Sequence, residues 1–567
     1  MATTVAAYLI ARLQQAGLEH VFAVPGDYAS PFLQVLDATP GIERVPNMNE
    51  LGSGYAADGY ARYRGIGAAC VQYGVGTFSL LNCAAGSFVE RVPVAVISAS
   101  PSAQDRQLER SEAILFHHST GELRADQIVF ENVTVASEIV HSAVEAPAQI
   151  DRAITAMLTH RRPVYIEVLN NVWSQACAAP QGTLAPLVTP SDPAALAAAL
   201  DAAWARLEAA KLPVLWAGVE IQRFGLQGTL QELVDASGLY FTTTSLGKTV
   251  LDENQDQFIG TYAGPASPAL TWAVMDDAAD CVVALGTIVT DDYLNIMHSS
   301  FGEIIEVTDE EARVGYEYYH RVTLQDFLSG LLGRFREDER FPRKYDLPKA
   351  EMPSVPDAEA GDGLSYNNFY AELNAFLKNE ELLDDIALVL GESTSLYVFG
   401  NLFGLPRGSF VAQAAWGSLG HETGCALGVA LGSGKRPWVV AGDGGFRMVC
   451  QELSSLAYRK CNAVVFVISN DAYAIEQAFV DIEAFTPNGQ FAPFDVLPPW
   501  NYIPLAQAFG ARGYRVDTVA QLRATLAEVK SLEDVPALVE VVIPQKDLAP
   551  QLKRLAETPP DSRKYRP

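Results

Sequence analysis

The chain has 567 residues, of which 49% are hydrophobic and 19% are charged, a composition typical of a folded globular protein. Lys and Arg together number 40 and Asp and Glu 68, so the formal net charge is −28. This balance argues against nucleic acid and anionic membrane surfaces as partners, because both repel an acidic protein. The apolar runs are far shorter than the roughly 18 residues that a membrane helix needs, so we expect no membrane-spanning segment.

The N-terminal segment and the cysteines bear on the cellular compartment. Residues 1–17 carry apolar side chains at helical spacing and lack both the basic start and the long apolar stretch of a signal peptide. Seven cysteines are scattered along the chain without a C-x-x-C pair, a pattern that favours reduced thiols over disulfides or a metal cluster. These features predict a cytoplasmic protein.

Two proline-rich segments without apolar periodicity, residues 177–193 and 341–365, divide the chain into three parts. The predicted domains are residues 1–180, 194–340 and 360–567, and each is long enough to bury a core of its own. In each domain short β-branched runs alternate with helical stretches. The runs are residues 21–24, 68–71, 94–98 and 164–168, then 214–217, 239–244, 281–286 and 304–307, then 386–390, 438–441, 463–468 and 538–543. This rhythm predicts an α/β fold of three consecutive doubly wound parallel-sheet domains, with ligands at the carboxyl ends of the strands.

A glycine-rich turn follows the predicted strand at residues 438–441. It reads Gly442-Asp443-Gly444-Gly445, and we expect a helix over residues 451–459 after it. Glycines allow a phosphate to approach the backbone, and a carboxylate suits Mg2+. Taken alone, the motif is explained equally well by an exposed strand–helix turn.

A second polar turn changes this interpretation. The predicted strand at residues 463–468 ends in Ser469-Asn470-Asp471-Ala472, and Asn470 follows Asp443 by 27 residues. That interval accommodates one right-handed crossover, which would bring both side chains to one sheet edge. A carboxylate, an amide oxygen and a backbone carbonyl at that edge make a plausible octahedral Mg2+ site.

The spacing of these two turns resembles the signature of thiamine-diphosphate enzymes. The resemblance implies thiamine diphosphate and Mg2+ as cofactors, with Asp443, Asn470 and the carbonyl of Ala472 as metal ligands and Gly444 and Gly445 beside the diphosphate. The chain departs from the family pattern at Gly445, where Ser or Ala is common, and at Ala472, where Gly is common. A backbone ligand tolerates Ala when its torsion angles allow.

Residues 47–62 form a predicted helix rich in Gly and Ala, with Glu50 at its start, where the helix dipole favours a negative charge. A simple capping role would explain a lone glutamate. The segment also resembles the family stretch whose glutamate contacts N1′ of the aminopyrimidine and favours the 4′-imino tautomer that removes the thiazolium C2 proton. By the same resemblance, Leu419 props the two cofactor rings together and the carbonyl of Gly417 accepts from the 4′-amino group.

The resemblance also implies an assembly. Glu50 and Asp443 lie in different predicted domains, and in this family the cofactor bridges the domains of two subunits. We therefore expect a homodimer at minimum and a homotetramer as the usual state.

Three further features point to one branch of the family. Asp27 follows Pro25-Gly26 after the first predicted strand, His117 and His118 form a pair in a predicted loop, and Glu476 begins a helix after the second polar turn. Each has a simple explanation as a turn residue, a solvated histidine or an exposed helix residue. Together they resemble the proton-handling cluster of the pyruvate, indolepyruvate and phenylpyruvate decarboxylases.

The resemblance implies a carbon–carbon lyase that converts a 2-oxo acid into an aldehyde and CO2. His and a perturbed carboxylate can exchange protons near neutral pH, as protonation of the decarboxylated intermediate and release of the aldehyde require. We assign Asp27 and His118 to the late proton steps, Glu476 to the steps around CO2 loss, and His117 to holding Asp27 or the substrate carboxylate.

The segment after the predicted strand at residues 386–390 bears on the size of the substrate. Leu396 stands where pyruvate-specific relatives carry a bulkier aromatic residue, which favours a medium-sized or aromatic 2-oxo acid. Compensating bulk from Tyr397 or from residues 548–555 would instead suit pyruvate. The resemblance implies that the cofactor contacts also include Pro25, Gly26, Thr394, Ser395 and Ile475, with Thr394 standing where many relatives have Asp.

Two alternatives remain, and a third is set aside. The enzyme could join the decarboxylated acid to a second carbonyl compound and act as a carboligase that forms 2-hydroxy ketones. The chain could instead be a catalytically silent binding or assembly protein, although Glu50, Asp443 and Asn470 are all present. A nicotinamide dehydrogenase would need a G-x-G-x-x-G motif after a strand, and no such motif is well placed.

Overall fold

The computed structural model describes residues 3–347 and 358–557, so part of the predicted linker at 341–365 lies outside the described residues. The chain forms two compact units. Unit 1 comprises Met1–Val188, Trp416–Pro437 and Val449–Ala463, and unit 2 comprises Thr189–Ala415, Trp438–Met448 and Val464–Pro567. Among the described residues, no helix is both long enough and apolar enough to cross a bilayer.

Unit 1 contains a six-stranded parallel sheet in the order β3-β2-β4-β5-β7-β6. Its strands are β2 (His20–Ala23), β3 (Glu43–Pro46), β4 (Gly67–Gln72), β5 (Val94–Ser100), β6 (Ser137–Val140) and β7 (Val164–Leu169). The four predicted runs are all strands. The two edge strands β3 and β6 escaped prediction because they are short and only partly buried, without a continuous apolar run.

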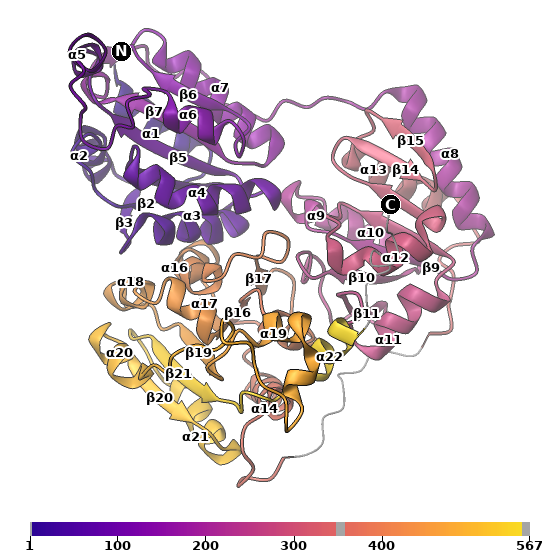
Figure 1. Ribbon diagram of the computed structural model, residues 1–567. Helices are drawn as coiled ribbons and strands as arrows, with labels where there is room; N and C mark the ends of the chain where they lie inside the picture. The colour runs from indigo at the N-terminus through magenta and orange to yellow at the C-terminus, as the bar shows by residue number, and fades with distance from the viewer. Residues whose placement is uncertain (1–2, 348–357, 558–567) are drawn as a thin grey trace. The chain divides into compact units, whose positions relative to one another are not determined.

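Helices and a small second sheet complete this part of unit 1. Helices α3 and α4 lie together on one face of the large sheet (Figure 1). The helices are α1 (Val5–Gln15), α2 (Ser30–Ala38), α3 (Glu50–Arg64), α4 (Val75–Val89), α5 (Ala103–Glu112), α6 (Ala125–Phe130) and α7 (Ala146–His160). The short strands β1 (Thr3–Thr4) and β8 (Ala176–Cys177) pair antiparallel.

Two helices from late in the chain belong to unit 1, namely α16 (His421–Ser433) and α18 (Glu452–Tyr458). Helix α16 packs against α3 through glycines. A Cβ atom on Gly428 would lie 1.8 Å from the carbonyl oxygen of Ala56, so only glycine permits this approach. The small residues of the predicted helix at 47–62 therefore serve a close helix–helix contact.

A buried charge network crosses the same contact. The carboxylate of Asp58 accepts from Arg62 Nε at 2.6 Å and lies 2.8 Å from His421 Nε2. Both partners favour the ionised form, and the pKa of Asp58 is held well below its usual value despite complete burial. The network fixes α3 and α16 relative to each other.

Unit 2 contains a seven-stranded sheet in the order β11-β10-β9-β12-β13-β14-β15. Its first five strands are parallel, and β14 and β15 add an antiparallel edge that the sequence pattern did not predict. The strands are β9 (Pro213–Ala217), β10 (Tyr240–Thr244), β11 (Phe258–Tyr262), β12 (Cys281–Leu285), β13 (Ile304–Val307), β14 (Glu311–Val314) and β15 (Glu317–His320). Its helices are α8 (Pro193–Ala209), α9 (Glu220–Arg223), α10 (Gln227–Ser237), α11 (Ala269–Trp272), α12 (Leu294–Ser299) and α13 (Leu324–Glu337).

Unit 2 also contains a six-stranded sheet in the order β17-β16-β18-β19-β21-β20 (Figure 1). Its strands are β16 (Ile386–Leu390), β17 (Phe410–Ala412), β18 (Arg436–Gly442), β19 (Val464–Ser469), β20 (Arg512–Val516) and β21 (Ala537–Val542). The accompanying helices of unit 2 are α14 (Tyr366–Asn379), α15 (Thr394–Phe399), α17 (Asp443–Met448), α19 (Ala474–Val480), α20 (Tyr502–Ala508), α21 (Val519–Lys530) and α22 (Pro550–Glu557). The α/β fold with three consecutive sheets is confirmed.

One short helix was not predicted. The helix predicted over residues 451–459 is α18, but the chain also forms α17, which begins at Asp443 itself. Glycines 444 and 445 are tolerated because they lie in the first turn of α17, where close approach matters more than helix propensity.

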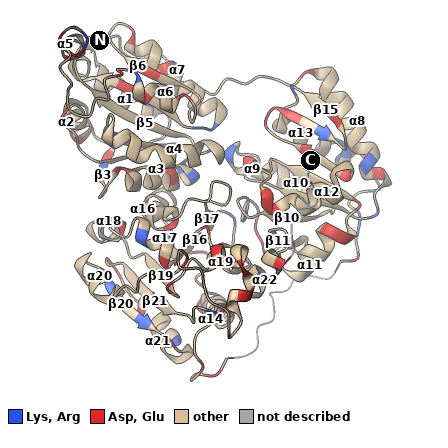
Figure 2. Ribbon diagram, in the orientation of Figure 1, with Lys and Arg blue, Asp and Glu red and all other residues tan. Residues whose placement is uncertain are grey.

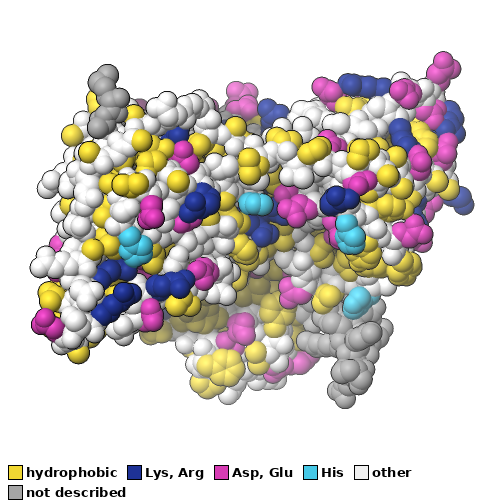
Figure 3. Space-filling view, turned by 90° about the horizontal axis from the view of Figure 1, so that it is seen from above, with side chains coloured by type: hydrophobic (Ala, Val, Ile, Leu, Met, Phe, Trp, Pro, Cys, Tyr) yellow, Lys and Arg dark blue, Asp and Glu magenta, His cyan; other side chains and the backbone are white. Residues whose placement is uncertain are grey.

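Charge is distributed through every part of the fold. Acidic residues lie on helices and strands of both units, with basic residues between them (Figure 2). On the face shown in Figure 3, basic and acidic side chains are interspersed. The negative balance of the sequence is therefore a general property of the chain.

Candidate active site

The first part of the candidate site lies in unit 2, where β18 and β19 run parallel and end side by side. Asp443 begins α17 directly after β18, and its side chain is 1% exposed. Its Oδ1 accepts from the N–H of Gly444 at 2.9 Å, and its Oδ2 accepts from the N–H of Asp471 at 2.8 Å. Burial raises the pKa of Asp443 to about 6, an effect that Arg447 partly offsets.

Asn470 and Ala472 lie in the turn that follows β19. The N–H of Ala472 donates to Asn470 Oδ1 at 3.3 Å, and Asn470 Nδ2 donates to the hydroxyl of Tyr366 at 3.3 Å. Ala472 also forms an isolated bridge with Val496, which fixes the turn. The structure therefore brings Asp443, Asn470 and Ala472 to one sheet edge, as the spacing predicted.

Glycine is required beside this edge. A Cβ atom on Gly444 would lie 2.2 Å from the ring of Tyr473, so a side chain at 444 would displace the turn. Gly445 follows in the first turn of α17, where backbone N–H groups lack acceptors within the helix. Thr394 and Ser395 are buried at the start of α15, where Ser393 Oγ accepts from the N–H of Ser395 at 3.2 Å.

The second part of the candidate site lies in unit 1, at the start of α3. Asn49 caps this helix by accepting from the N–H of Gly52 at 2.7 Å, and Glu50 is its first residue. The half-buried side chain of Glu50 makes no hydrogen bond or ion pair with any other residue in the described part of the chain. It lies over Gly76, where a Cβ atom would come within 3.4 Å of Glu50 Cγ. The carboxyl group of Glu50 is therefore able to accept hydrogen bonds that no described residue supplies.

Sequence reasoning missed the residue that supports this turn. Glu452 of α18 accepts from Asn47 Nδ2 at 3.0 Å and from the N–H of Met48 at 3.2 Å. Gly52 leaves room for it, since a Cβ atom there would lie 2.1 Å from Glu452 Oε1. No local pattern could reveal this contact, because Met48 and Glu452 are 404 residues apart in the chain.

The segment that carries Gly417 and Leu419 is fixed against the same helices. Glu90 accepts from the N–H of Trp416 at 3.1 Å, and the hydroxyl of Ser418 lies 2.6 Å from that of Tyr55. Gly417 adopts a left-handed backbone with φ of 69°, which favours glycine at this position. Unit 1 therefore holds Glu50, Gly417 and Leu419 together.

Comparison with known proteins assigns both parts of the candidate site to one protein family. The thiamine pyrophosphate enzyme family matches the chain with its N-terminal TPP binding domain at residues 3–128, its central domain at 200–332 and its C-terminal TPP binding domain at 396–541. The chain belongs to this family.

Full-length relatives agree with this assignment. The chain is 30% identical to a probable pyruvate decarboxylase of Schizosaccharomyces pombe, over 97% of this chain and 95% of the relative. It is 31% identical to pyruvate decarboxylase 3 of Oryza sativa subsp. indica, over 97% and 93% respectively. It is 30% identical to an alpha-keto-acid decarboxylase of Mycobacterium leprae, over 99% and 96% respectively.

The two TPP binding domains imply thiamine diphosphate, which is thiamine pyrophosphate under another name. The residues present fit this coenzyme. Asp443 is a buried carboxylate whose oxygens accept from two backbone N–H groups, with Oδ2 4.0 Å from Arg447 Nη2, so lone pairs remain for a hard cation such as Mg2+. The carboxyl group of Glu50, which has no partner among the described residues, can likewise form a hydrogen bond with a ring nitrogen of the coenzyme.

In this thiamine pyrophosphate enzyme, Asp27 follows β2 in unit 1 and is the centre of a polar cluster. His117 Nε2 lies 3.1 Å from Asp27 Oδ2, and Gln72 Nε2 donates to Asp27 Oδ1 at 2.7 Å. Gly26 makes room for Gln72, because a Cβ atom at 26 would lie 2.2 Å from Gln72 Oε1. Sequence reasoning missed Gln72, which lies at the end of β4, next to β2 in the sheet.

The histidine pair completes this cluster. The ring of His117 stacks on Tyr28 with centroids 4.8 Å apart, and the ring of His118 meets that of His117 edge-on at 4.7 Å. Pro25 is exposed beside the cluster. Glu476 belongs to unit 2, where it is exposed in the first turn of α19. The structure thus joins Asp27, His117 and His118 and places Glu476 in the other unit.

Three apolar residues that the sequence analysis considered for the substrate or the cofactor meet in unit 2. Tyr397, Ile475 and Leu555 pack in one cluster with Ala263 and Ala266. The hydroxyl of Tyr397 donates to Asp292 Oδ1 at 3.0 Å. The bulky side chains that the sequence analysis considered, Tyr397 and Leu555 of the C-terminal helix, therefore lie in the same cluster as Ile475.

Proposed function

We propose that this enzyme uses thiamine diphosphate and Mg2+ to decarboxylate a 2-oxo acid without oxidation, releasing an aldehyde and CO2. The observation that carries the proposal is the contact of Asp27 with His117, with His118 alongside, in a chain whose Glu50 carboxyl has no partner among the described residues. The names of the full-length relatives support the same reaction class.

The coenzyme, when bound, supplies an electron sink for the bond to the departing carboxylate. Asp443, Asn470 and the carbonyl of Ala472 would hold the metal. Glu50 would hold a proton at N1′ of the aminopyrimidine, and the carbonyl of Gly417 would accept from the 4′-amino group. The side chain of Leu419 would lie between the two rings of the coenzyme and support them.

The remaining polar groups move protons. His117 holds the carboxylate of Asp27, which also accepts from Gln72. Asp27 and His118 serve the late steps, in which a carbon is protonated and the product hydroxyl loses its proton. Glu476 acts around the loss of CO2. Imidazole and carboxyl groups suit these roles because they exchange protons near neutral pH.

The substrate is a medium-sized or aromatic 2-oxo acid. Leu396 leaves more room than an aromatic residue would, and Tyr397, Ile475 and Leu555 provide an apolar wall. The hydroxyl of Tyr397 is engaged by Asp292, so the wall presents mainly carbon to a substrate side chain. Pyruvate is the alternative substrate, since the bulk of Tyr397 and Leu555 in this cluster would suit a small acid.

The test is a panel of 2-oxo acids that includes pyruvate, a branched-chain acid, phenylpyruvate and indolepyruvate, supplied with thiamine diphosphate and Mg2+. CO2 and aldehyde are measured together, with and without an aldehyde acceptor. We expect equal amounts of CO2 and aldehyde, with the highest kcat/KM for a larger acid. Predominant 2-hydroxy ketone would identify a carboligase instead. No CO2 from any acid would favour a catalytically silent binding protein and refute the proposal.

The assembly and organisation follow from the same proposal. We propose domains at residues 1–180, 194–340 and 360–567, a homodimer at minimum that pairs into a homotetramer, and a cytoplasmic location. Light scattering on the coenzyme-loaded enzyme tests the assembly, and a monomer that retains full activity would contradict it.

A further inference from the structure

The histidine pair stands on a loop that is held in an uncommon backbone conformation. His118 has a φ of 70°, in the left-handed region that non-glycine residues seldom adopt. Such a conformation persists only where the surroundings fix it, and it is common at functional sites. The groups behind the loop therefore bear on the position of both imidazole rings.

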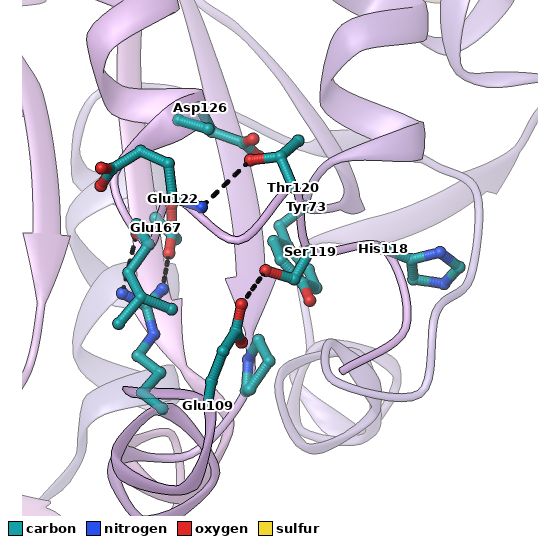
Figure 4. Close-up of a pocket in the computed structure, with 12 residues that line it drawn as sticks. Tyr73, Glu109, His118, Ser119, Thr120, Glu122, Asp126 and Glu167 are labelled. Atoms are coloured by element: carbon teal, nitrogen blue, oxygen red, sulfur yellow. Dashed lines mark hydrogen bonds and ion pairs between the residues drawn. The ribbon is translucent and has the colours of Figure 1, made fainter. Parts of the chain in front are cut away.

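The first support comes from α5. The hydroxyl of Ser119, next to His118, donates to Glu109 Oε1, and the Glu109 residue is 9% exposed (Figure 4). In Figure 4 Ser119 points toward Glu109, whereas the ring of His118 points away from it. Glu109 thus holds the inner side of the loop while the imidazole remains outside.

Helix α5 is itself anchored to the sheet. Arg106 lies one turn before Glu109 on the same helix face and forms an ion pair with Glu167 of β7. Arg106 Nη2 also donates to Ser100 Oγ at 2.6 Å, and Nη1 donates to the carbonyl of Leu123 at 3.0 Å. The helix face that carries Glu109 is therefore fixed, and so is the carboxylate that reaches the loop.

A second support comes from the end of β4. The hydroxyl of Tyr73 donates to the carbonyl of His117 at 2.6 Å. The backbone of Gly74 also packs against the loop, since a Cβ atom at 74 would lie 2.3 Å from the carbonyl oxygen of His118. Asp126 fixes Gly74 in turn by accepting from its N–H at 2.7 Å.

The space behind the loop is polar. Arg106, Glu109, Ser119, Asp126 and Glu167 line a cavity of about 10 Å3, room for roughly one water molecule. Glu109 Oε2 is buried and accepts no hydrogen bond from the described residues. Because hydrogen bonds support the loop here, loss of one of them weakens the hold on its position.

We propose that Glu109, through Ser119, and Tyr73, through the carbonyl of His117, are positioning residues that set the His117–His118 loop against Asp27. This inference rests on the proposed function and goes beyond it, because neither residue touches Asp27 or an imidazole nitrogen. Misplacement of a catalytic group by about 1 Å can cost up to a hundredfold in rate. The two supports therefore matter for the late proton steps more than for folding.

The variants test whether the hydrogen bonds to the His117–His118 loop, and not other groups on the same helix, set its position. Glu109→Leu and Ser119→Ala each remove the same hydrogen bond from opposite ends, and Glu109→Gln keeps an acceptor for Ser119. Tyr73→Phe removes only a hydroxyl. Glu112→Leu is the matched control, because Glu112 is exposed on the same helix and makes no hydrogen bond or ion pair with another described residue.

Two readouts are needed. One is NMR of the full-length, histidine-labelled protein, with the His117 resonances assigned by their loss in His117→Gln. The other is the ratio of aldehyde release to CO2 release in a single turnover of the loaded enzyme. The NMR readout does not depend on activity, so failure of the proposed function would leave it intact.

We expect Glu109→Leu and Ser119→Ala to shift the His117 resonances and to slow aldehyde release roughly tenfold relative to CO2 release. The double variant should be no worse than either single variant, because both remove one bond. Glu109→Gln should keep the His117 resonances and the release ratio near those of the wild type. Tyr73→Phe should shift the His117 resonances. If Glu109→Leu does not fold, Ser119→Ala carries the test. His117 resonances and release ratios equal to those of Glu112→Leu in all these variants would overturn the inference.

Discussion

The two parts of the candidate site are built in opposite ways. In unit 2, Asp443 and Asn470 are almost completely buried and come from consecutive strands of one sheet. In unit 1, the side chains of Asp27 and His117 are 61% and 52% exposed and are held by groups from distant segments. A cation and a diphosphate are best anchored in a rigid, dry turn, whereas groups that exchange protons need access to water and substrate. Each part therefore has the burial that its proposed chemistry requires.

The largest effect is expected from the buried part. Asp443→Ala removes the only carboxylate among the proposed metal ligands, so the enzyme should lose bound coenzyme and all decarboxylation. Affinity for thiamine diphosphate with Mg2+ should fall by more than the roughly hundredfold that loss of an outer-shell partner costs. Calorimetric titration measures this affinity. Asp471→Asn, which neutralises a partly exposed carboxylate in the same turn, is the control and should retain the coenzyme. Unchanged affinity in Asp443→Ala would remove this residue from the metal site.

The unpaired carboxyl of unit 1 comes next. Glu50→Gln keeps the shape but cannot share a carboxyl proton with N1′, so exchange of the coenzyme C2 proton should fall roughly a thousandfold. Hydrogen–deuterium exchange followed by NMR after acid quench measures it. Coenzyme and Mg2+ binding should persist, which separates this variant from Asp443→Ala. Wild-type exchange in Glu50→Gln would refute the role of Glu50.

A smaller effect is expected within the exposed cluster. His118→Ala should slow aldehyde release roughly a hundredfold and CO2 release much less, because His118 is assigned to the late proton steps. Rapid-quench measurement of CO2 and stopped-flow measurement of aldehyde in one turnover compare the two steps. Equal slowing of both steps would place His118 elsewhere in the reaction.

The last effect is one on stability, not on catalysis, and concerns the helix contact in unit 1. Glu422 at the start of α16 is buried, and burial raises its pKa from 4.5 to about 7. Between these values the unfolded chain releases a proton that the folded protein keeps, so the wild-type protein loses stability as the pH rises. Glu422→Gln should remove this loss and gain up to about 3 kcal/mol over wild type at pH 8, and nothing at pH 4. Thermal unfolding between pH 4 and 8 tests it, with Glu112→Gln as the exposed control. A gain that does not depend on pH would contradict the buried ionisation.

The difference between the two parts also explains what could be predicted from the sequence. The runs at 438–441 and 463–468, with their polar turns, placed Asp443 and Asn470 correctly because one crossover separates them. Most of the strands whose residues are all buried were found for the same local reason, but the buried edge strands β11 and β17 were not predicted. Edge strands such as β3, β6 and β15 were missed because exposed residues interrupt their apolar pattern.

The supports of unit 1 could not be predicted. Glu452 beneath the start of α3, Gln72 on Asp27 and Glu109 behind the histidine loop are each ordinary polar residues in the sequence. Their structural roles become visible only in contacts with residues 404, 45 and 10 positions away, respectively. Side-chain hydrogen bonds of this kind depend on tertiary geometry, which leaves no periodic or motif signal.

The most direct test of the account is an experimental structure of the enzyme with thiamine diphosphate and Mg2+ bound. We predict the metal between Asp443, Asn470, the carbonyl of Ala472 and the diphosphate, and the aminopyrimidine N1′ within hydrogen-bond distance of a Glu50 carboxyl oxygen. A coenzyme seated away from either Glu50 or Asp443, or no coenzyme at saturating concentration, would contradict it.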